Sequence, residues 1–206
     1  YGDKVSGWWF DGGYQHIQFN EAIAQVYANA AKQGNPKAIV TFNPGVRVIH
    51  YTSAEDYTAG ELNEPLQVIP KDRWLDGSQW HALTYIGSTW GRRDTRFTGE
   101  QWARWVGAVA AKDGVVTLDM GPNYDPKAGP IGALDSNQVK QVQAIRHALR
   151  KPSAARPPKR LARADSFLGI HFDFHAGPDC TEIGKNTTRE MIENVIAQVH
   201  PDYVQI

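Results

Sequence analysis

The chain has 206 residues, of which 41% are hydrophobic and 21% charged, and its formal net charge is zero. This composition is typical of a globular protein, and the balanced charge gives no support to nucleic acid or an anionic membrane as a partner. No apolar run reaches the length that spans a bilayer. Cys180 is the single cysteine, so no disulfide can form within the chain.

The first predicted element is a strand over 7–11 that ends in an acidic residue. Its sequence, Gly-Trp-Trp-Phe-Asp, has apolar side chains on both faces, as in a parallel strand that is covered on both sides. Asp11 stands where the strand ends, and Gly12 and Gly13 permit the turn that follows. Because chemistry in parallel barrels lies at the C-terminal strand ends, Asp11 is a candidate catalytic residue. The alternative is that it only caps a loop.

Strands and helices alternate through the next part of the chain. Asn20 can cap a helix over 21–33, whose apolar residues form one stripe of Ile23, Val26, Tyr27 and Ala30. Region 46–80 has no clear period and predicts a long loop. The alternation favours a parallel sheet, open or closed into a barrel. Strands are predicted as parallel neighbours over 7–11, 38–42, 82–88 and 115–120, with helices outside them over 21–33, 98–111 and 136–149.

The composition of the chain changes after residue 150. Residues 151–165 contain three prolines and five basic residues, which predicts an exposed linker. A strand is expected over 167–174, then a helix with a capping box from Thr187 to Glu190, then a strand that opens at Tyr203. We expect the strand over 167–173 to pair in parallel beside 115–120. Both ends of the chain read as cut from a longer protein.

Carboxylates and histidines supply the candidate chemistry. Asp11 ends a strand, and Glu61 and Glu64 lie in the long loop. His171, Asp173 and His175 alternate onto one face of the expected strand, where they could bind a metal ion or, as we favour, line a sugar pocket by hydrogen bonding. No nucleotide-binding or acyl-transfer motif is present. Carboxylates together with many aromatic residues indicate glycoside hydrolysis, which needs a nucleophile or base and a proton donor.

Three segments, in order, resemble the α-L-fucosidases of glycoside hydrolase family 29. Residues 9–12 read Trp-Phe-Asp-Gly, residues 88–92 read Ser-Thr-Trp-Gly-Arg, and residues 114–123 read Gly-Val-Val-Thr-Leu-Asp-Met-Gly-Pro-Asn. The resemblance implies an α/β fold, a (β/α)8 TIM-type barrel of which this chain holds a part, and a retaining mechanism with Asp11 as nucleophile. It implies no cofactor and no metal ion.

The resemblance identifies the proton donor less directly than the nucleophile. Many members of that family carry a Glu after a Trp at the position where this chain reads Trp80-His81. Glu61 is therefore the expected acid/base and Glu64 the reserve. Trp9, Trp90, His171, Asp173 and His175 are the expected substrate-binding residues.

The order of the segments suggests a domain organisation. Residues 168–175 loosely resemble the first barrel strand of the same family, although they follow the Trp-Phe-Asp-Gly segment instead of preceding it. We therefore expect the C-terminal part of a glycosidase-like barrel over 1–150, a linker over 151–165, and the first βαβ segment of a second or permuted barrel over 166–206. A tandem fragment is favoured over a circular permutant.

The predicted function is that of a retaining, exo-acting α-L-fucosidase-like hydrolase, inactive as this piece alone. The alternative is a non-catalytic carbohydrate-binding or scaffold domain derived from a glycosidase barrel. The expected partner is a carbohydrate, with neither nucleic acid nor membrane, and the sequence does not indicate an oligomeric state. The resemblance favours a secreted or periplasmic protein, although no signal peptide is present in these residues.

Overall fold

The computed structural model describes residues 2–149, 167–172, 185 and 187–205 of a mixed α/β protein. The chain divides into two compact units: Tyr1–Leu83 with Lys112–Val115, and Thr84–Ala111 with Val116–Ile206. The predicted linker over 151–165 lies outside the described residues. The assignment of domains to two barrels stays a prediction.

The first unit is built on two parallel strands, β1 (Gly7–Phe10) and β2 (Ile39–Phe42), with Phe10 opposite Phe42. Helix α1 (Glu21–Lys32) connects them, and Asn20 caps it by accepting hydrogen bonds from the N–H groups of Ala22 and Ile23. Short 3-10 helices cover Gly2–Lys4 and Gln15–Ile17, and a small antiparallel hairpin joins β3 (Trp74–Leu75) to β4 (Ser78–Gln79).

Helix α1 packs on these strands by a different face from the one its apolar stripe predicts. Its fully buried residues are Ala24 and Ala28, which pack with Val40 and Phe42 of β2. Val26 and Tyr27 of the predicted stripe are 65% and 49% exposed. The physical reason is size, because alanine side chains allow the helix to approach the aromatic strands closely.

The predicted long loop contains a strand-like segment, which corrects the expectation that β2 and β5 (His81–Tyr85) are direct neighbours. Residues 56–62 run between them: the N–H of Asp56 bonds to the carbonyl of Val40, and the N–H of Leu62 bonds to the carbonyl of Leu83. Parallel bridges join Tyr57 to Gln79 and Glu61 to Leu83. The segment therefore takes the place of a strand in the first unit.

A four-stranded parallel sheet has the order β5-β6-β7-β8. Thr117 of β6 pairs with Gly169 of β7, so the predicted parallel docking of the strand near residue 168 beside 115–120 is confirmed. The remaining bounds are β6 (Val115–Asp119), β7 (Leu168–His171), β8 (Tyr203–Gln205), α2 (Gly99–Ala110), α3 (Ser136–Leu149) and α4 (Arg189–Val199).

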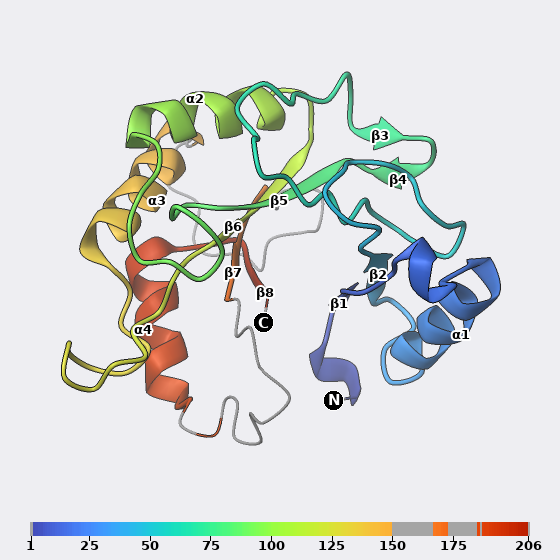
Figure 1. The fold of residues 1–206 in the computed structure, drawn as a ribbon, viewed down its shortest axis with the longest axis horizontal. Helices are drawn as coiled ribbons and strands as arrows, with labels where there is room; N and C mark the ends of the chain where they lie inside the picture. The colour runs from blue at the N-terminus through green and yellow to red at the C-terminus, as the bar shows by residue number, and fades with distance from the viewer. Residues whose placement is uncertain (1, 150–166, 173–184, 186, 206) are drawn as a thin grey trace. The chain divides into compact units, whose positions relative to one another are not determined.

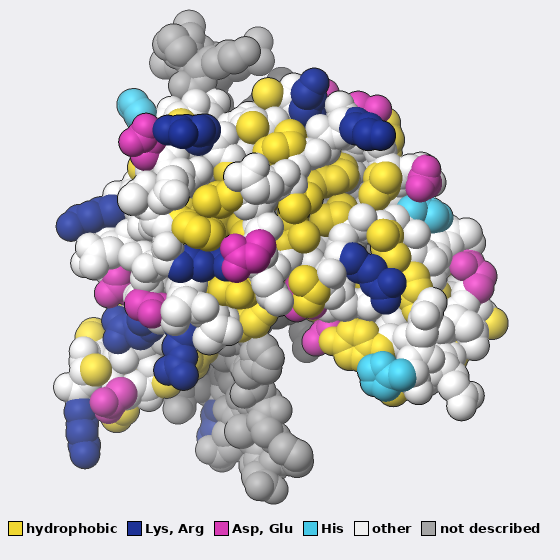
Figure 2. All heavy atoms as spheres, turned by 45° about the horizontal axis from the view of Figure 1, so that its top comes forward, with side chains coloured by type: hydrophobic (Ala, Val, Ile, Leu, Met, Phe, Trp, Pro, Cys, Tyr) yellow, Lys and Arg dark blue, Asp and Glu magenta, His cyan; other side chains and the backbone are white. Residues whose placement is uncertain are grey.

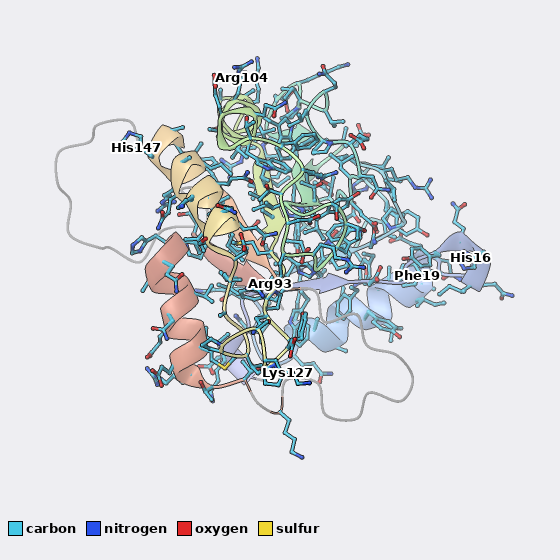
Figure 3. The ribbon with its side chains drawn as sticks, turned by 60° about the vertical axis from the view of Figure 1, so that its left-hand side comes forward. His16, Phe19, Arg93, Arg104, Lys127 and His147 are labelled. Carbon is cyan, nitrogen blue, oxygen red and sulfur yellow. The ribbon has the colours of Figure 1, made fainter. Side chains whose placement is uncertain are left out.

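In the second unit α2, α3 and α4 lie one after another outside the strands (Figure 1). The buried face of α2 is formed by Trp102, Trp105, Val106 and Val109. Arg104 projects away from that face (Figure 3) and pairs with Glu100. The capping box of α4 lies one residue later than predicted, because Thr188 and Met191 form it in place of Thr187 and Glu190.

Charged side chains of both signs are interspersed on the face drawn in Figure 2, and neither sign gathers into a large patch there. This distribution agrees with the zero net charge. Among the described residues no helix combines the length and the hydrophobicity that a transmembrane span requires.

The first unit buries one carboxylic acid, Glu55, whose side chain has no exposed surface. Its Oε1 accepts a hydrogen bond from the N–H of Tyr51 at 2.7 Å and lies 3.7 Å from Nδ1 of His50. Its Oε2 has no hydrogen-bond partner among the described residues. Burial raises the pKa of Glu55 to about 7, because a low-dielectric environment disfavours the charged form.

We predict that Glu55→Gln makes the protein more stable than the wild type near neutral pH. An acid whose pKa is raised in the folded state keeps its proton while the unfolded chain loses it, so stability falls as pH rises from about 4.5 to about 7. The free energy of unfolding of the variant, relative to the wild type, should rise by up to about 3 kcal/mol over this range. Denaturant unfolding at several pH values measures this difference. The exposed control Glu64→Gln should show no such trend, and an equal trend in both variants would contradict the assignment to Glu55.

Candidate active site

The site forms where the two parallel strands of the first unit end. Asp11 follows β1 directly and Asn43 follows β2 directly, so the pairing of Phe10 with Phe42 makes these two residues neighbours. The N–H of Asn43 donates to the carbonyl of Phe10 at 2.8 Å, which extends the ladder by one residue. Gly13 allows the close approach of the loop, since a Cβ there would lie 2.9 Å from the carbonyl oxygen of Asn43.

Glu61 reaches the same place from the strand-like segment. Gly60 precedes it with φ of +67°, and a Cβ on Gly60 would lie 1.9 Å from the carbonyl oxygen of His81. Only glycine therefore permits the contact with β5 from which Glu61 projects. The indole N–H of Trp9 donates to the carbonyl of Ala59 at 3.2 Å, which ties β1 to this segment.

The side-chain amide of Asn43 connects the two carboxylates. Its Nδ2 donates to Oδ1 of Asp11 at 3.0 Å and to Oε2 of Glu61 at 2.7 Å. The two N–H bonds of an amide group diverge by about 120°, which puts the two acceptor oxygens about 5 Å apart. A separation of about 5–5.5 Å is that of the carboxyl pair in retaining glycosidases.

Three donors converge on one oxygen of Asp11. Besides Asn43, the N–H of Gly12 and the hydroxyl of Tyr14 donate to Oδ1, at 2.8 and 3.1 Å. No described residue donates to Oδ2 of Asp11. Among the described residues, Asn43 is the one donor to Glu61, and its bond goes to Oε2. Burial, and then the neighbouring charge of Asp11, raise the pKa of Tyr14 to about 12, so Tyr14 remains a donor at neutral pH.

The other predicted site residues lie in several places. Glu64 is exposed, and nothing in its surroundings favours it over Glu61. Trp90 and His171 belong to the second unit, where their rings meet edge to face at 6.4 Å. Asp173 and His175 lie outside the described residues, so neither the sugar-pocket nor the metal alternative for that strand is tested, and all these binding roles stay predictions.

His81 occupies the position where the resemblance expects an acid. The structure buries it at 1% exposure, and its Nδ1 lies 2.9 Å from the carbonyl oxygen of Thr58. In addition, its N–H donates to the hydroxyl of Thr58. His81 therefore helps to join β5 to the strand-like segment that carries Glu61.

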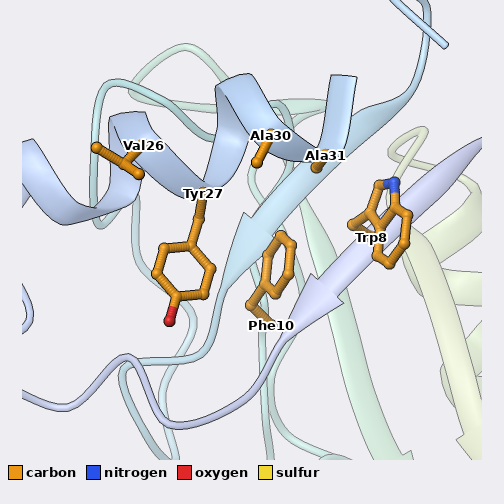
Figure 4. A pocket seen from close by; sticks show the side chains of 6 residues that line it. All are labelled: Trp8, Phe10, Val26, Tyr27, Ala30 and Ala31. Carbon is orange, nitrogen blue, oxygen red and sulfur yellow. The ribbon is translucent and has the colours of Figure 1, made fainter. Parts of the chain in front are cut away.

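An apolar groove of about 340 Å³ also lies in the first unit, between β1 and α1. Figure 4 shows Trp8 and Phe10 of β1 facing Val26, Tyr27, Ala30 and Ala31 of α1. Side chains alternate along a strand, so the groove lies on the face of β1 opposite to Trp9 and Asp11. Its lining contains no carboxylate and no histidine, so the two carboxylates are the better candidate for a reactive site.

Asn43 and Tyr14 are the two site residues that the sequence analysis did not identify. The signal for Asn43 was available: it follows a strand as Asp11 does, and parallel neighbours bring such positions together. For Tyr14 no comparable signal exists, because its contact with Asp11 depends on the path of the glycine-rich turn. No three His, Cys, Asp or Glu side chains among the described residues are grouped to hold a metal ion.

Comparison with models of protein families and with curated proteins gives no match. Among solved structures, an endo-fucoidan hydrolase from glycoside hydrolase family 107 is similar, with a TM-score of 0.58 and 19% sequence identity. The similarity covers 70% of this chain and 27% of that chain, so the chain spans little more than a quarter of its neighbour. The chain therefore has the fold of part of a glycoside hydrolase.

Proposed function

We propose that the complete protein is a retaining glycoside hydrolase that acts on α-L-fucosides, with Asp11 as nucleophile and Glu61 as acid/base. The observation that carries the proposal is the single amide group that binds both carboxylates, at a separation that suits a double displacement. The fold similarity to a glycoside hydrolase supports the reaction class. A TIM-type barrel in the complete protein is part of this proposal.

The contacts of Asp11 suggest how the first step proceeds. Oδ1 is held by three donors, which leaves the electron pair of Oδ2 to form a bond to the anomeric carbon. The bond from that carbon to the leaving oxygen breaks, and the proton of Glu61 moves to this oxygen. In the second step water attacks the same carbon and gives a proton to Glu61, while the bond from that carbon to Oδ2 breaks and releases Asp11 as a carboxylate.

The fold neighbour favours a second candidate of the same chemistry. That protein is an endo-fucoidan hydrolase, so the complete protein could cleave within a fucose-containing polysaccharide instead of removing terminal fucose. Aryl α-L-fucosides report the exo reaction, whereas the release of oligosaccharides from fucoidan reports the endo reaction. The exo activity is our first choice because of the three sequence segments that resemble family 29.

A non-catalytic carbohydrate-binding domain is the alternative of a different class. It would have no need for two carboxylates on one amide group, because sugar binding uses hydrogen bonds and aromatic faces in many arrangements. Sugar binding in calorimetry, without turnover of any fucoside or fucoidan by the complete protein, would favour this alternative.

We predict that Asp11→Asn in the complete protein lowers kcat by several orders of magnitude, because an amide oxygen is a poor nucleophile. Hydrolysis of an aryl α-L-fucoside measures the loss, and circular dichroism checks the fold. Asp3→Asn is a matched control, since Asp3 is an exposed acid of the same unit, and should keep full activity. An Asp11→Asn enzyme with activity near that of the wild type would end the assignment.

Glu61→Gln should slow substrates with poor leaving groups far more than activated aryl fucosides, because only the former need a proton. A loss of about 10²- to 10⁴-fold is expected for the former. In Glu61→Ala, azide should restore turnover of an activated substrate and yield a fucosyl azide of retained configuration, as it attacks the fucosyl ester on Asp11. Glu64→Gln is the control. Selective loss in Glu64→Gln instead would move the acid/base role to Glu64.

A further inference from the structure

We propose that Asn43 is a positioning residue that fixes which oxygen of Glu61 carries the transferable proton. The inference rests on the proposed function, since it concerns the same two carboxylates. It goes beyond that proposal because it assigns the direction of proton transfer to a neutral side chain that contacts no reacting atom.

The orientation of the Asn43 amide group is fixed from several sides. Its backbone N–H bonds to the carbonyl of Phe10, and the residue is 1% exposed. The N–H of Gly45 donates to its Oδ1 at 3.1 Å, so the oxygen faces Gly45 and the nitrogen faces the carboxylates. A flipped amide group would lose that bond and would place two acceptors, its oxygen and a carboxylate oxygen, against each other.

An amide nitrogen can only donate, and this decides the protonation pattern. Both oxygens that face Nδ2 must be acceptors, which are Oδ1 of Asp11 and Oε2 of Glu61. In a protonated carboxyl group the carbonyl oxygen is the stronger acceptor, so the bond from Nδ2 assigns Oε2 as the carbonyl oxygen and the acidic proton of Glu61 to Oε1. When that proton moves to the leaving oxygen, Oε2 already has the donor that stabilises the new carboxylate.

The amide group of Asn43 is a neutral donor to both Asp11 and Glu61. It offers one donor to each carboxylate without adding charge. Asp11 has two further donors, from Gly12 and Tyr14, whereas Glu61 has none among the described residues. The donors are therefore unequal: three bond to Asp11, which the proposed mechanism uses as an anion, and one bonds to Glu61, which it uses as the acid.

The test is the pH dependence of kcat/KM in the complete protein carrying Asn43→Ala. Loss of a donor to both carboxylates disfavours their ionised forms. The acidic and basic limbs of the pH profile should therefore both shift to higher pH, by about one pH unit. The rate at the optimum should fall about a hundredfold, the effect of losing one donor at an active site. Asn43→Asp keeps the shape of the side chain and the bond from Gly45, and should move both limbs further, because it adds a negative charge.

Asn35→Ala is the matched control. Asn35 also makes one donor and one acceptor bond, to Val5 and Lys37, and it touches neither carboxylate. This variant should change stability but not the pH profile. If folded Asn43→Ala or Asn43→Asp keeps the profile of the wild type while Asp11→Asn is inactive, the positioning role is refuted and the proposed function stands. If Asp11→Asn is active, the proposed function itself fails.

Discussion

The parallel pairing of β1 with β2 is the constraint on which the candidate site depends. With Phe10 opposite Phe42, the next residue of each strand enters the same small volume, which brings Asp11 to the amide group of Asn43. A shift of one residue would turn either side chain to the opposite face of the sheet. The register is held by the core itself, because Trp8 and Phe10 pack with Ala24, Ala28, Val40 and Phe42 on the side of α1.

The two faces of β1 make different contacts. Trp8 and Phe10 stack at 5.9 Å and line the groove against α1, whereas Trp9 bonds to the segment that carries Glu61. The strand-like segment is the second support of the site. Thr58 replaces part of the regular ladder by bonding through its hydroxyl to both the carbonyl and the N–H of His81, and Gly60 allows the approach that lets Glu61 project. Packing on one face and polar contacts on the other position the same two carboxylates.

Strands and helices with a clear hydrophobic period could be predicted from the sequence. The position of Asp11 at the end of a strand could be predicted as well. The segment over 56–62 was missed because Asp56, Thr58 and Gly60 give no apolar alternation, and its pairing is completed by side chains. The buried face of α1 was predicted wrongly because the large apolar residues suggest a core face, whereas alanines make the close contact. Asn43 was missed because a polar residue before Pro44 and Gly45 has the pattern of an ordinary turn.

The most direct measurement is the identification of the residue that becomes covalently glycosylated. Treatment of the complete protein with a fluorinated L-fucosyl inhibitor, followed by digestion and peptide mass spectrometry, should place the fucosyl ester on Asp11. Three donors hold its Oδ1, whereas no residue that the structure describes donates to its Oδ2. Asp11→Asn should remain unlabelled. A label on another carboxylate of a protein that hydrolyses fucosides would contradict the account.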